Sequence, residues 1–304
     1  MDQPEDAAIT PLPQGIRQTW RRRLALLAVG ATAACSPVRM LNRMAPDRLA
    51  AEGVAYGPGP RQLLDVYAPV PQGRPAPVVV FFYGGNWDSG DRADYRFVGA
   101  SLAARGCLAL VPDYRLHPQV RFPDFLRDCA LAVAWARENA RRWGGDPARL
   151  FVMGHSAGAY NAAMLALDPE WLGAVGMVPR RDLAGAVGIA GPYDFLPLRS
   201  AMLMDLFGPE AMRPRTQPIA FADGGNPPML LLHGASDTLV EPGNTIRLAE
   251  RIRSRGGSVK ERIYPDLGHQ LIAGALSGSL RLLAPTLRDS LAFIGSPGGE
   301  RETV

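Results

Sequence analysis

Apolar residues beyond about residue 60 fall into short runs separated by longer stretches with helical periodicity. The run from Val78 to Phe82 is continuous, as expected of a strand covered on both faces. Turn residues such as Gly, Pro, Asn and Asp bound most of these runs. The strands predicted in this way are 62–69, 76–84, 107–114, 149–158 with its turn, 183–194, 227–237 and 258–266.

The stretches between these strands repeat their apolar residues at helical spacing. The predicted helices are 95–106, 122–145, 156–168, 243–257 and 277–293. Strands and helices in alternation predict the α/β class, with a mostly parallel sheet and helices on both faces.

Residues 193–226 interrupt this alternation with an irregular stretch rich in Met, Leu, Pro and Phe. Insertions of this kind in parallel sheets form functional loops or lids, or pack a small cluster of their own at the surface. The sequence leaves both interpretations open, and we treat 193–226 as a small cap-like insertion.

The first 35 residues predict an export signal or lipoprotein leader. Arg21–Arg23 precede an apolar run from Leu24 to Ala34, which is too short to span a bilayer but has the length of a signal-peptide core. Cys35 follows two alanines and resembles a lipobox cysteine, although Thr32 stands where that motif prefers leucine. We expect an exported protein, periplasmic or tethered to a membrane through a lipid on Cys35. A plain Sec leader and a twin-arginine signal remain alternatives.

The remaining regions are predicted as a linker or N-terminal extension at 36–59, a single domain at 60–296 and a disordered tail at 297–304. The net charge is +4, and beyond the N-terminal cluster the arginines are scattered, so we expect no nucleic-acid partner. Cys107 and Cys129 lie in a strand and a helix pattern and are interpreted as buried thiols, with a disulfide left open. No cysteine–histidine spacing suggests a metal site.

One motif carries candidate chemistry. Gly154-His155-Ser156-Ala157-Gly158 is a G-x-S-x-G sequence that follows a predicted strand and opens a predicted helix. This is the context of a nucleophile elbow, a strand-to-helix turn that exposes a serine hydroxyl. Ser156 is therefore the candidate nucleophile, and the alternative is an ordinary helix-capping serine.

A serine nucleophile needs a base, and the chain has four histidines. His155 lies inside the elbow and is expected to point into the scaffold. His117 lies upstream of the serine, and His233 ends a strand and is interpreted as structural. His269 lies in the loop after the last strand, so it is the candidate base under the chain order serine, acid, histidine.

The base needs an orienting carboxylate. Asp237 lies in the loop after the penultimate strand and is the predicted acid. Asp266, three residues before the candidate base, and Glu241 are the competing carboxylates.

Gly84, Gly85 and Asn86 follow the buried strand at 76–84 and have almost no side chain before Trp87. Glycines in such a loop allow a substrate carbonyl to reach backbone N–H groups. We expect these three residues, with Ala157 after the nucleophile, to form an oxyanion hole.

At this point the chain resembles a known superfamily over about residues 60–295. The α/β-hydrolase esterases related to hormone-sensitive lipase, kynurenine formamidase and feruloyl-esterase-like enzymes share its motifs. The resembling segments are "YGGNW", "VPDYRLHPQVRFPDFLRD", "GHSAG", "HGASDTLV" and the "GH" at 268–269. The chain departs from the family at Tyr83, where the first loop residue is usually histidine, so the bonds that support this loop must differ.

The resemblance implies the α/β-hydrolase fold and a cofactor-free serine hydrolase acting on a small-molecule carboxylic ester, with a short to medium acyl chain. It implies attack by Ser156 and places Trp87, Tyr160 and Tyr193 as pocket walls, although each could be plain core. Asp113 and Arg115 would brace the oxyanion loop or form an internal ion pair. Alternatives left open are an amide hydrolase of the arylformamidase kind, a peptidase, and a non-catalytic binding protein on the same fold.

Overall fold

The computed structural model describes residues 37–280 and 282–296. The predicted leader with Cys35 and the predicted tail at 297–304 lie outside the described residues. Met1–Met40 form a separate unit, and the description below concerns the unit that begins at Leu41.

The chain builds one eight-stranded sheet with the strand order β1-β2-β4-β3-β5-β6-β7-β8. β2 pairs antiparallel with β1 and β4, and all other neighbours pair parallel. The mostly parallel sheet predicted from the alternating pattern is confirmed. The strands are β1 (Leu49–Ala55), β2 (Leu63–Tyr67), β3 (Ala76–Phe82), β4 (Leu108–Pro112), β5 (Gly145–His155), β6 (Gly185–Ile189), β7 (Met229–Gly234) and β8 (Val259–Tyr264).

Strand β1 lies within the stretch predicted as a linker. Its residues are half-exposed or exposed, because β1 forms one edge of the sheet and is not covered on both faces. The segment "LAAEGVA" therefore lacks the continuous apolar run that marked the central strands. The sheet thus begins before residue 60, within the predicted linker.

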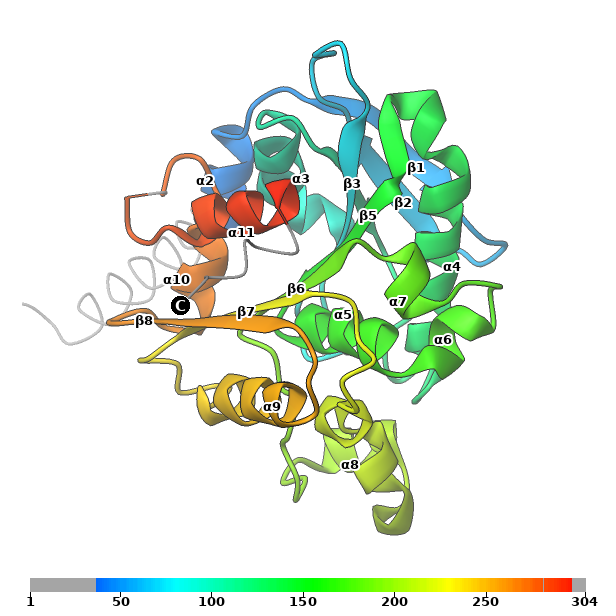
Figure 1. Ribbon diagram of the computed structural model, residues 1–304, viewed down its shortest axis with the longest axis vertical. Helices are drawn as coiled ribbons and strands as arrows, with labels where there is room; N and C mark the ends of the chain where they lie inside the picture. The colour runs from blue at the N-terminus through cyan, green and yellow to red at the C-terminus, as the bar shows by residue number, and fades with distance from the viewer. Residues whose placement is uncertain (1–36, 281, 297–304) are drawn as a thin grey trace, which may run out of the picture. The chain divides into compact units, whose positions relative to one another are not determined.

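Helices cover both faces of the sheet (Figure 1). α3, α10 and α11 lie on one face, and α4, α5 and α9 lie on the other. The α-helices are α2 (Pro37–Arg43), α3 (Arg96–Ala103), α4 (Asp124–Asn139), α5 (Ala157–Leu167), α6 (Pro169–Gly173), α7 (Pro179–Asp182), α8 (Ala201–Phe207), α9 (Gly243–Ser254), α10 (His269–Gly274) and α11 (Thr286–Gly295). Short 3-10 helices are η1 (Arg92–Tyr95), η2 (Ala140–Trp143), η3 (Glu210–Thr216) and η4 (Pro218–Phe221).

The predicted final helix at 277–293 is wrong in its first half. Turns occupy most of the stretch before Pro285, and α11 begins only at Thr286. Proline has no N–H to donate and its ring clashes with the preceding turn, so a helix can begin after Pro285 but cannot run through it. The pattern of apolar residues continued across the proline and concealed this break.

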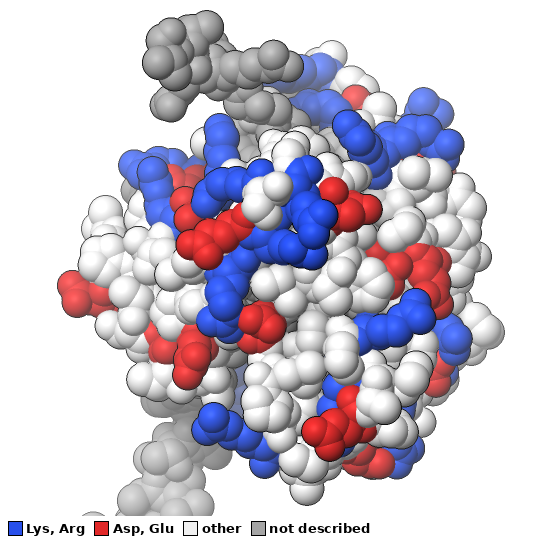
Figure 2. Space-filling view, turned by 60° about the horizontal axis from the view of Figure 1, so that its bottom comes forward, with Lys and Arg blue, Asp and Glu red and all other residues white. Residues whose placement is uncertain are grey.

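The surface carries both charge signs. Figure 2 shows basic and acidic side chains interspersed on the face that carries the lower part of Figure 1. Arg247 pairs with Asp194 at 2.5 Å, and Arg253 pairs with Glu261 at 3.1 Å. No helix among residues 37–280 and 282–296 is long and apolar enough to cross a membrane.

Candidate active site

Ser156 stands at the sharp turn between β5 and α5. Its backbone has φ 55° and ψ −122°, a conformation that non-glycine residues rarely adopt. A Cβ on Gly154 would meet the carbonyl oxygen of Gly158 at 2.1 Å, and a Cβ on Gly158 would meet that of Phe82 at 2.1 Å. The turn therefore requires both glycines of the motif, and it leaves the serine partly exposed at a helix N-terminus.

The predicted nucleophile, base and acid form one hydrogen-bonded chain. His269 Nε2 lies 2.8 Å from Ser156 Oγ, and His269 Nδ1 lies 2.7 Å from Asp237 Oδ2. These three residues come from the ends of β5, β7 and β8, which run parallel and so end at the same edge of the sheet. Neither Asp266 nor Glu241 contacts His269 among the hydrogen bonds and ion pairs of the described residues.

The surroundings of His269 fix its tautomer. A carboxylate only accepts hydrogen bonds, so Nδ1 carries the proton and donates it to Asp237. Nε2 is then unprotonated and accepts the hydrogen bond of the Ser156 hydroxyl. This is the arrangement in which an imidazole can remove a proton from a serine.

Asp237 is held in its ionised form by four donors. Its Oδ2 accepts from both His269 Nδ1 and His233 Nε2, the latter at 3.1 Å. Its Oδ1 accepts from the backbone N–H groups of Leu239 and Val240, each at 2.9 Å. Burial alone would raise the pKa of the Asp237 carboxyl, but these hydrogen bonds outweigh it and hold that pKa well below its usual value.

His233 has a larger part in this site than the sequence suggested. It is fully buried, its Nδ1 lies 2.8 Å from Thr245 Oγ1, and its Nε2 lies 2.9 Å from the carbonyl of Val240. Because a carbonyl accepts, Nε2 carries the proton and also faces Asp237. Sequence reasoning assigned His233 a structural role only, although its position four residues before Asp237 at a strand end was the available signal.

His155 supports the histidine loop from inside the elbow. Its Nε2 lies 3.0 Å from the backbone carbonyl of His269, and the two ring centroids are 4.8 Å apart. Burial, and after it the charge of His269, lowers the pKa of His155 to about 3. The ring is thus neutral near pH 7, and its N–H holds His269 in place from behind.

The buried neutral His155 predicts a pH dependence of stability. In the unfolded chain a histidine has a pKa of about 6.5, so between pH 6.5 and about 3 the unfolded state binds more protons than the folded state. The free energy of unfolding should therefore fall as the pH falls through this window, by at most about 1.4 kcal/mol per pH unit for one proton. His155→Gln keeps an N–H donor but does not titrate, so this part of the slope should disappear in urea unfolding at pH 7, 6 and 5. Identical slopes in the two proteins would show that the pKa of His155 does not differ between the folded and the unfolded state.

The glycine loop lies against the nucleophile. A Cβ on Gly84 would meet Ser156 Cβ at 2.9 Å, so the loop backbone borders the serine directly. The backbone N–H groups of Gly85 and Asn86 make no hydrogen bond within the described part of the chain, and that of Ala157 is free at the start of α5. The backbone of Gly84 is hydrogen-bonded to the hydroxyl of Tyr95. Gly85, Asn86 and Ala157 are therefore the available donors of the predicted oxyanion hole.

The loop itself is strained. Gly85 has φ 129°, and a Cβ there would meet the carbonyl oxygen of Ser89 at 2.3 Å. Asn86 and Trp87 also have positive φ, at 54° and 60°. Such a conformation persists only where the surrounding contacts hold it.

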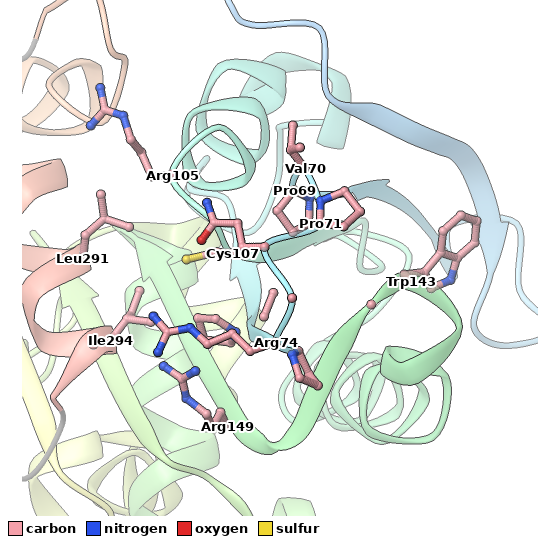
Figure 3. A pocket seen from close by; sticks show the side chains of 18 residues that line it. Pro69, Val70, Pro71, Arg74, Arg105, Cys107, Trp143, Arg149, Leu291 and Ile294 are labelled. Carbon is pink, nitrogen blue, oxygen red and sulfur yellow. The ribbon is translucent and has the colours of Figure 1, made fainter.

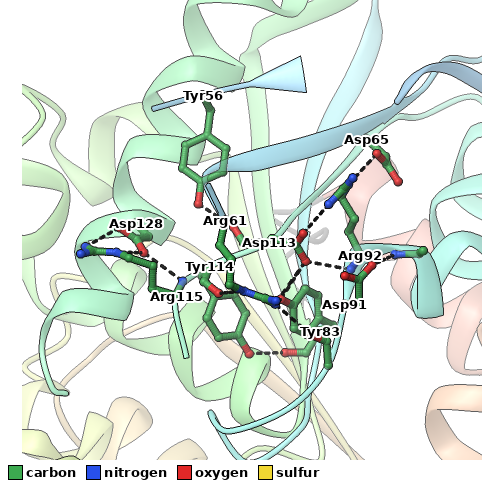
Figure 4. Close-up of polar contacts among 12 residues, drawn as sticks. Tyr56, Arg61, Asp65, Tyr83, Asp91, Arg92, Asp113, Tyr114, Arg115 and Asp128 are labelled. Atoms are coloured by element: carbon green, nitrogen blue, oxygen red, sulfur yellow. Dashed lines mark hydrogen bonds and ion pairs between the residues drawn. The ribbon is translucent and has the colours of Figure 1, made fainter. Parts of the chain in front are cut away.

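A polar network holds this loop (Figure 4). Its members are Arg61 from the connection between β1 and β2, Arg92 from η1, and Asp113, which directly follows β4. The Tyr83 hydroxyl donates to Asp113 at 2.9 Å and accepts from Arg61 at 2.7 Å. Arg61 also donates to the carbonyl of Gly90 at 2.9 Å, and Arg92 forms an ion pair with Asp113. Asp113 thus braces the oxyanion loop, one of the two roles considered for it. Tyr83, which stands where the family usually has histidine, makes this contact through its hydroxyl.

Arg115, considered beside Asp113, belongs to a separate ion pair. It makes two hydrogen bonds of 2.8 Å to the buried Asp128. His117 makes no hydrogen bond with Ser156 among the described residues, and its Nε2 lies 2.7 Å from Asp205.

We expect Tyr83→Phe to destabilise the protein by about 1–3 kcal/mol, because it leaves buried Asp113 and Arg61 each short of a partner. It should also lower kcat several-fold, since the oxyanion loop loses its support. Tyr264→Phe is the matched control, because that hydroxyl donates to Asp289 at 2.7 Å away from the site. Urea unfolding and ester kinetics measure both effects, and an equal loss of kcat in the two variants would contradict a specific role for Tyr83.

The predicted pocket residues are buried, and they differ in what they contact. Trp87 and Tyr160 pack edge to face at 5.0 Å, with hydrogen bonds from Trp87 Nε1 to Asn161 and from the Tyr160 hydroxyl to the carbonyl of Thr216. They belong to an aromatic cluster that joins the glycine loop, α4, α5 and the 193–226 insertion. Its members are Trp87, Phe125, Tyr160, Phe195 and Phe207.

Tyr193 is a core residue. Its ring is fully buried, and a Cβ on Gly188 in β6 would meet its hydroxyl at 2.1 Å. Its ring packs against β6 at Gly188 and has no ring contact with the aromatic cluster among the described residues. Cys107 and Cys129 are free buried thiols. Within the described ranges, no group of three or more His, Cys, Asp or Glu could hold a metal ion.

The fold is that of the α/β-hydrolases, as the order of strands in the sheet and the strand-to-helix elbow show. The hydrogen-bonded serine, histidine and aspartate form a site of the serine-hydrolase type. The chain belongs to the BD-FAE family, whose model matches residues 64–252. The family assignment agrees with the resemblance found in the sequence.

Individual relatives point to the same class. Esterase LipC of Mycobacterium tuberculosis is 34% identical over 249 residues, which are 74% of this chain and 61% of that protein. A probable isoprenylcysteine alpha-carbonyl methylesterase of Arabidopsis thaliana is 28% identical over 71% of this chain and 50% of its own length. This chain therefore spans only about half to three fifths of these relatives.

Solved structures share the fold. A carbohydrate esterase from gut microbiota superposes with a TM-score of 0.72 at 19% identity, covering 83% of this chain and 98% of that one. Esterase 2 of Thermogutta terrifontis superposes with a TM-score of 0.68 at 25% identity, covering 83% and 97%.

Proposed function

We propose that the protein hydrolyses carboxylic esters of short to medium acyl chain through an acyl-enzyme formed on Ser156. The observation that carries the proposal is the hydrogen-bonded chain from Ser156 through His269 to Asp237 beside free backbone donors. Membership of the BD-FAE family and the esterase names of the relatives support the reaction class.

In the proposed reaction Ser156 Oγ attacks the ester carbonyl while His269 Nε2 takes its proton. The developing oxyanion accepts hydrogen bonds from the backbone of Gly85, Asn86 and Ala157, which are in place before the reaction starts. His269 then gives the proton to the departing alcohol, leaving the acyl group on Ser156. A water molecule, deprotonated by the same imidazole, attacks the acyl-enzyme and releases the carboxylic acid. Asp237 holds the imidazole and stabilises its positive charge throughout.

The aromatic cluster supports a limited acyl length. Trp87 directly follows the oxyanion residues, and Tyr160 lies one helical turn after Ser156. Both rings are at most 2% exposed and are fixed by hydrogen bonds as well as packing. Rings fixed beside the glycine loop and in the first turns of α5 adjust poorly to added groups, which supports a limited acyl length.

We expect kcat/KM on p-nitrophenyl esters to peak between acetate and hexanoate and to fall at least tenfold for palmitate. Trp87→Ala should shift this peak to longer chains, because it opens a space beside the oxyanion loop. Trp171→Ala, which removes a buried indole from helix α6, controls for general destabilisation. A maximum at palmitate would exclude the proposed acyl length, and no turnover of any ester would redirect the search to N-formylated aryl amines.

A further inference from the structure

A cavity of about 430 Å³ opens at the edge of the sheet opposite Ser156 (Figure 3). The carboxyl ends of β3 and β5 lead to the glycine loop and the elbow, whereas their amino ends line this cavity through Ala76 and Arg149. Arg149 lies seven residues before Ser156 on β5, which separates the two places by roughly 20 Å at about 3.3 Å per strand residue. The cavity is thus remote from the candidate active site.

Three arginines from different elements line the cavity. Arg74 belongs to the loop before β3, Arg105 follows α3, and Arg149 lies in β5. No Asp or Glu is among the lining residues, and none of these arginines has an ion pair or side-chain hydrogen bond within the described part of the chain. Arg105 extends away from Arg74 and Arg149 in Figure 3, and a Cβ on Gly278, outside the lining, would lie 4.0 Å from its Nη2. The like charges of Arg74 and Arg149 repel each other, and an anion between them would remove that repulsion.

The wall contains no hidden counterion. Cys107 is the one lining residue whose side chain could become negative, and burial raises the pKa of its thiol to about 12. The thiol therefore stays protonated and neutral near pH 7. The positive charge of the cavity is uncompensated by its own lining.

The other walls are apolar. Leu291 and Ile294 of α11 lie on one side, and Val70 is 54% exposed in the loop before β3. An apolar wall beside arginines suits a ligand that combines an anionic group with an apolar body. Guanidinium groups bind phosphate and carboxylate oxygens in pairs of hydrogen bonds, which adds geometric selectivity to the charge attraction.

We propose that this cavity binds an amphiphile with an anionic phosphate-like head group, held by Arg74 and Arg149. The apolar body of the ligand lies against Leu291 and Ile294. The site is separate from ester hydrolysis, and its occupation does not depend on Ser156.

Calorimetric titration of the full chain with n-octyl phosphate tests this site. Inorganic phosphate and octyl glucoside, which carry only the head charge or only the chain, should each bind at least tenfold more weakly. The double variant R74A/R149A should bind octyl phosphate at least tenfold more weakly than the wild type. The matched control is R251A/R255A, which removes two exposed arginines from the region of α9 and should bind normally.

Two further arms make the result specific. Binding should persist after Ser156 is blocked with an organophosphate, and R74A/R149A should hydrolyse p-nitrophenyl acetate at the wild-type rate. Phosphatidylcholine vesicles with and without phosphatidylglycerol identify the source. If anionic vesicles retain the wild type and R251A/R255A but not R74A/R149A, the ligand is a lipid head group. If the protein binds octyl phosphate but no vesicles, the ligand is a free amphiphile. Equal affinity of the two double variants, or no binding of octyl phosphate, would overturn the proposal.

Discussion

Replacing Ser156 with alanine is expected to lower kcat for p-nitrophenyl acetate by about 10⁵- to 10⁶-fold, to a residual rate due to the oxyanion donors and binding alone. The reason is geometric, because within the described ranges Ser156 Oγ is the one oxygen hydrogen-bonded to His269 Nε2. The fold should be unaffected, since an alanine can occupy the turn as the serine does and no packing is lost. Steady-state kinetics with a circular-dichroism melting curve measure the two effects.

Ser254→Ala provides the control, because this residue is exposed and its hydroxyl bonds, among the described residues, only the backbone carbonyl of Arg251 in α9. Its kcat should equal that of the wild type. Retention of more than about one per cent of wild-type kcat in Ser156→Ala would mean that another group attacks the ester.

Asp237→Asn should be the next most damaging change, with kcat lowered by about 10⁴-fold. All four hydrogen bonds to this side chain come from donors, namely His269, His233 and two backbone N–H groups. An amide nitrogen in either position would face a donor. If it faces His269, the imidazole must turn its unprotonated nitrogen toward the amide, and Nε2 can no longer accept the serine proton.

Asp289→Asn controls for the loss of a partly buried carboxylate, because Asp289 accepts hydrogen bonds from Tyr264 and Arg262 away from the site. It should cost stability but leave kcat unchanged. A kcat for Asp237→Asn within tenfold of the wild type would show that Asp237 does not orient the base, and Asp266 and Glu241 would need the same test.

The alternation of apolar runs with helical periodicity was sufficient to predict most of the fold, because the central strands of a parallel sheet are buried on both faces. Their apolar runs, as in Val78–Phe82, therefore stand out in the sequence. Edge strand β1 lacks this signal because it is half-exposed. The end of the chain was misjudged because Pro285 interrupts an apolar pattern that otherwise continues into α11.

At the site, the chain order of Ser156, Asp237 and His269 could be read from the sequence because each follows a strand at the same edge of the sheet. The supporting contacts could not be read in this way. His155 touches the carbonyl of His269, 114 residues later in the chain, and Arg61, before β2, reaches Tyr83, after β3, although β4 lies between these two strands. Such bonds depend on side-chain geometry between elements that no local pattern relates.

The most direct test of the central claim is to incubate the protein with paraoxon and to measure its intact mass and peptide map. The account predicts one diethylphosphoryl group per chain, attached to Ser156, formed together with loss of esterase activity and slowed strongly by His269→Ala. Full activity with an unmodified Ser156, or stable labelling at another residue, would contradict it.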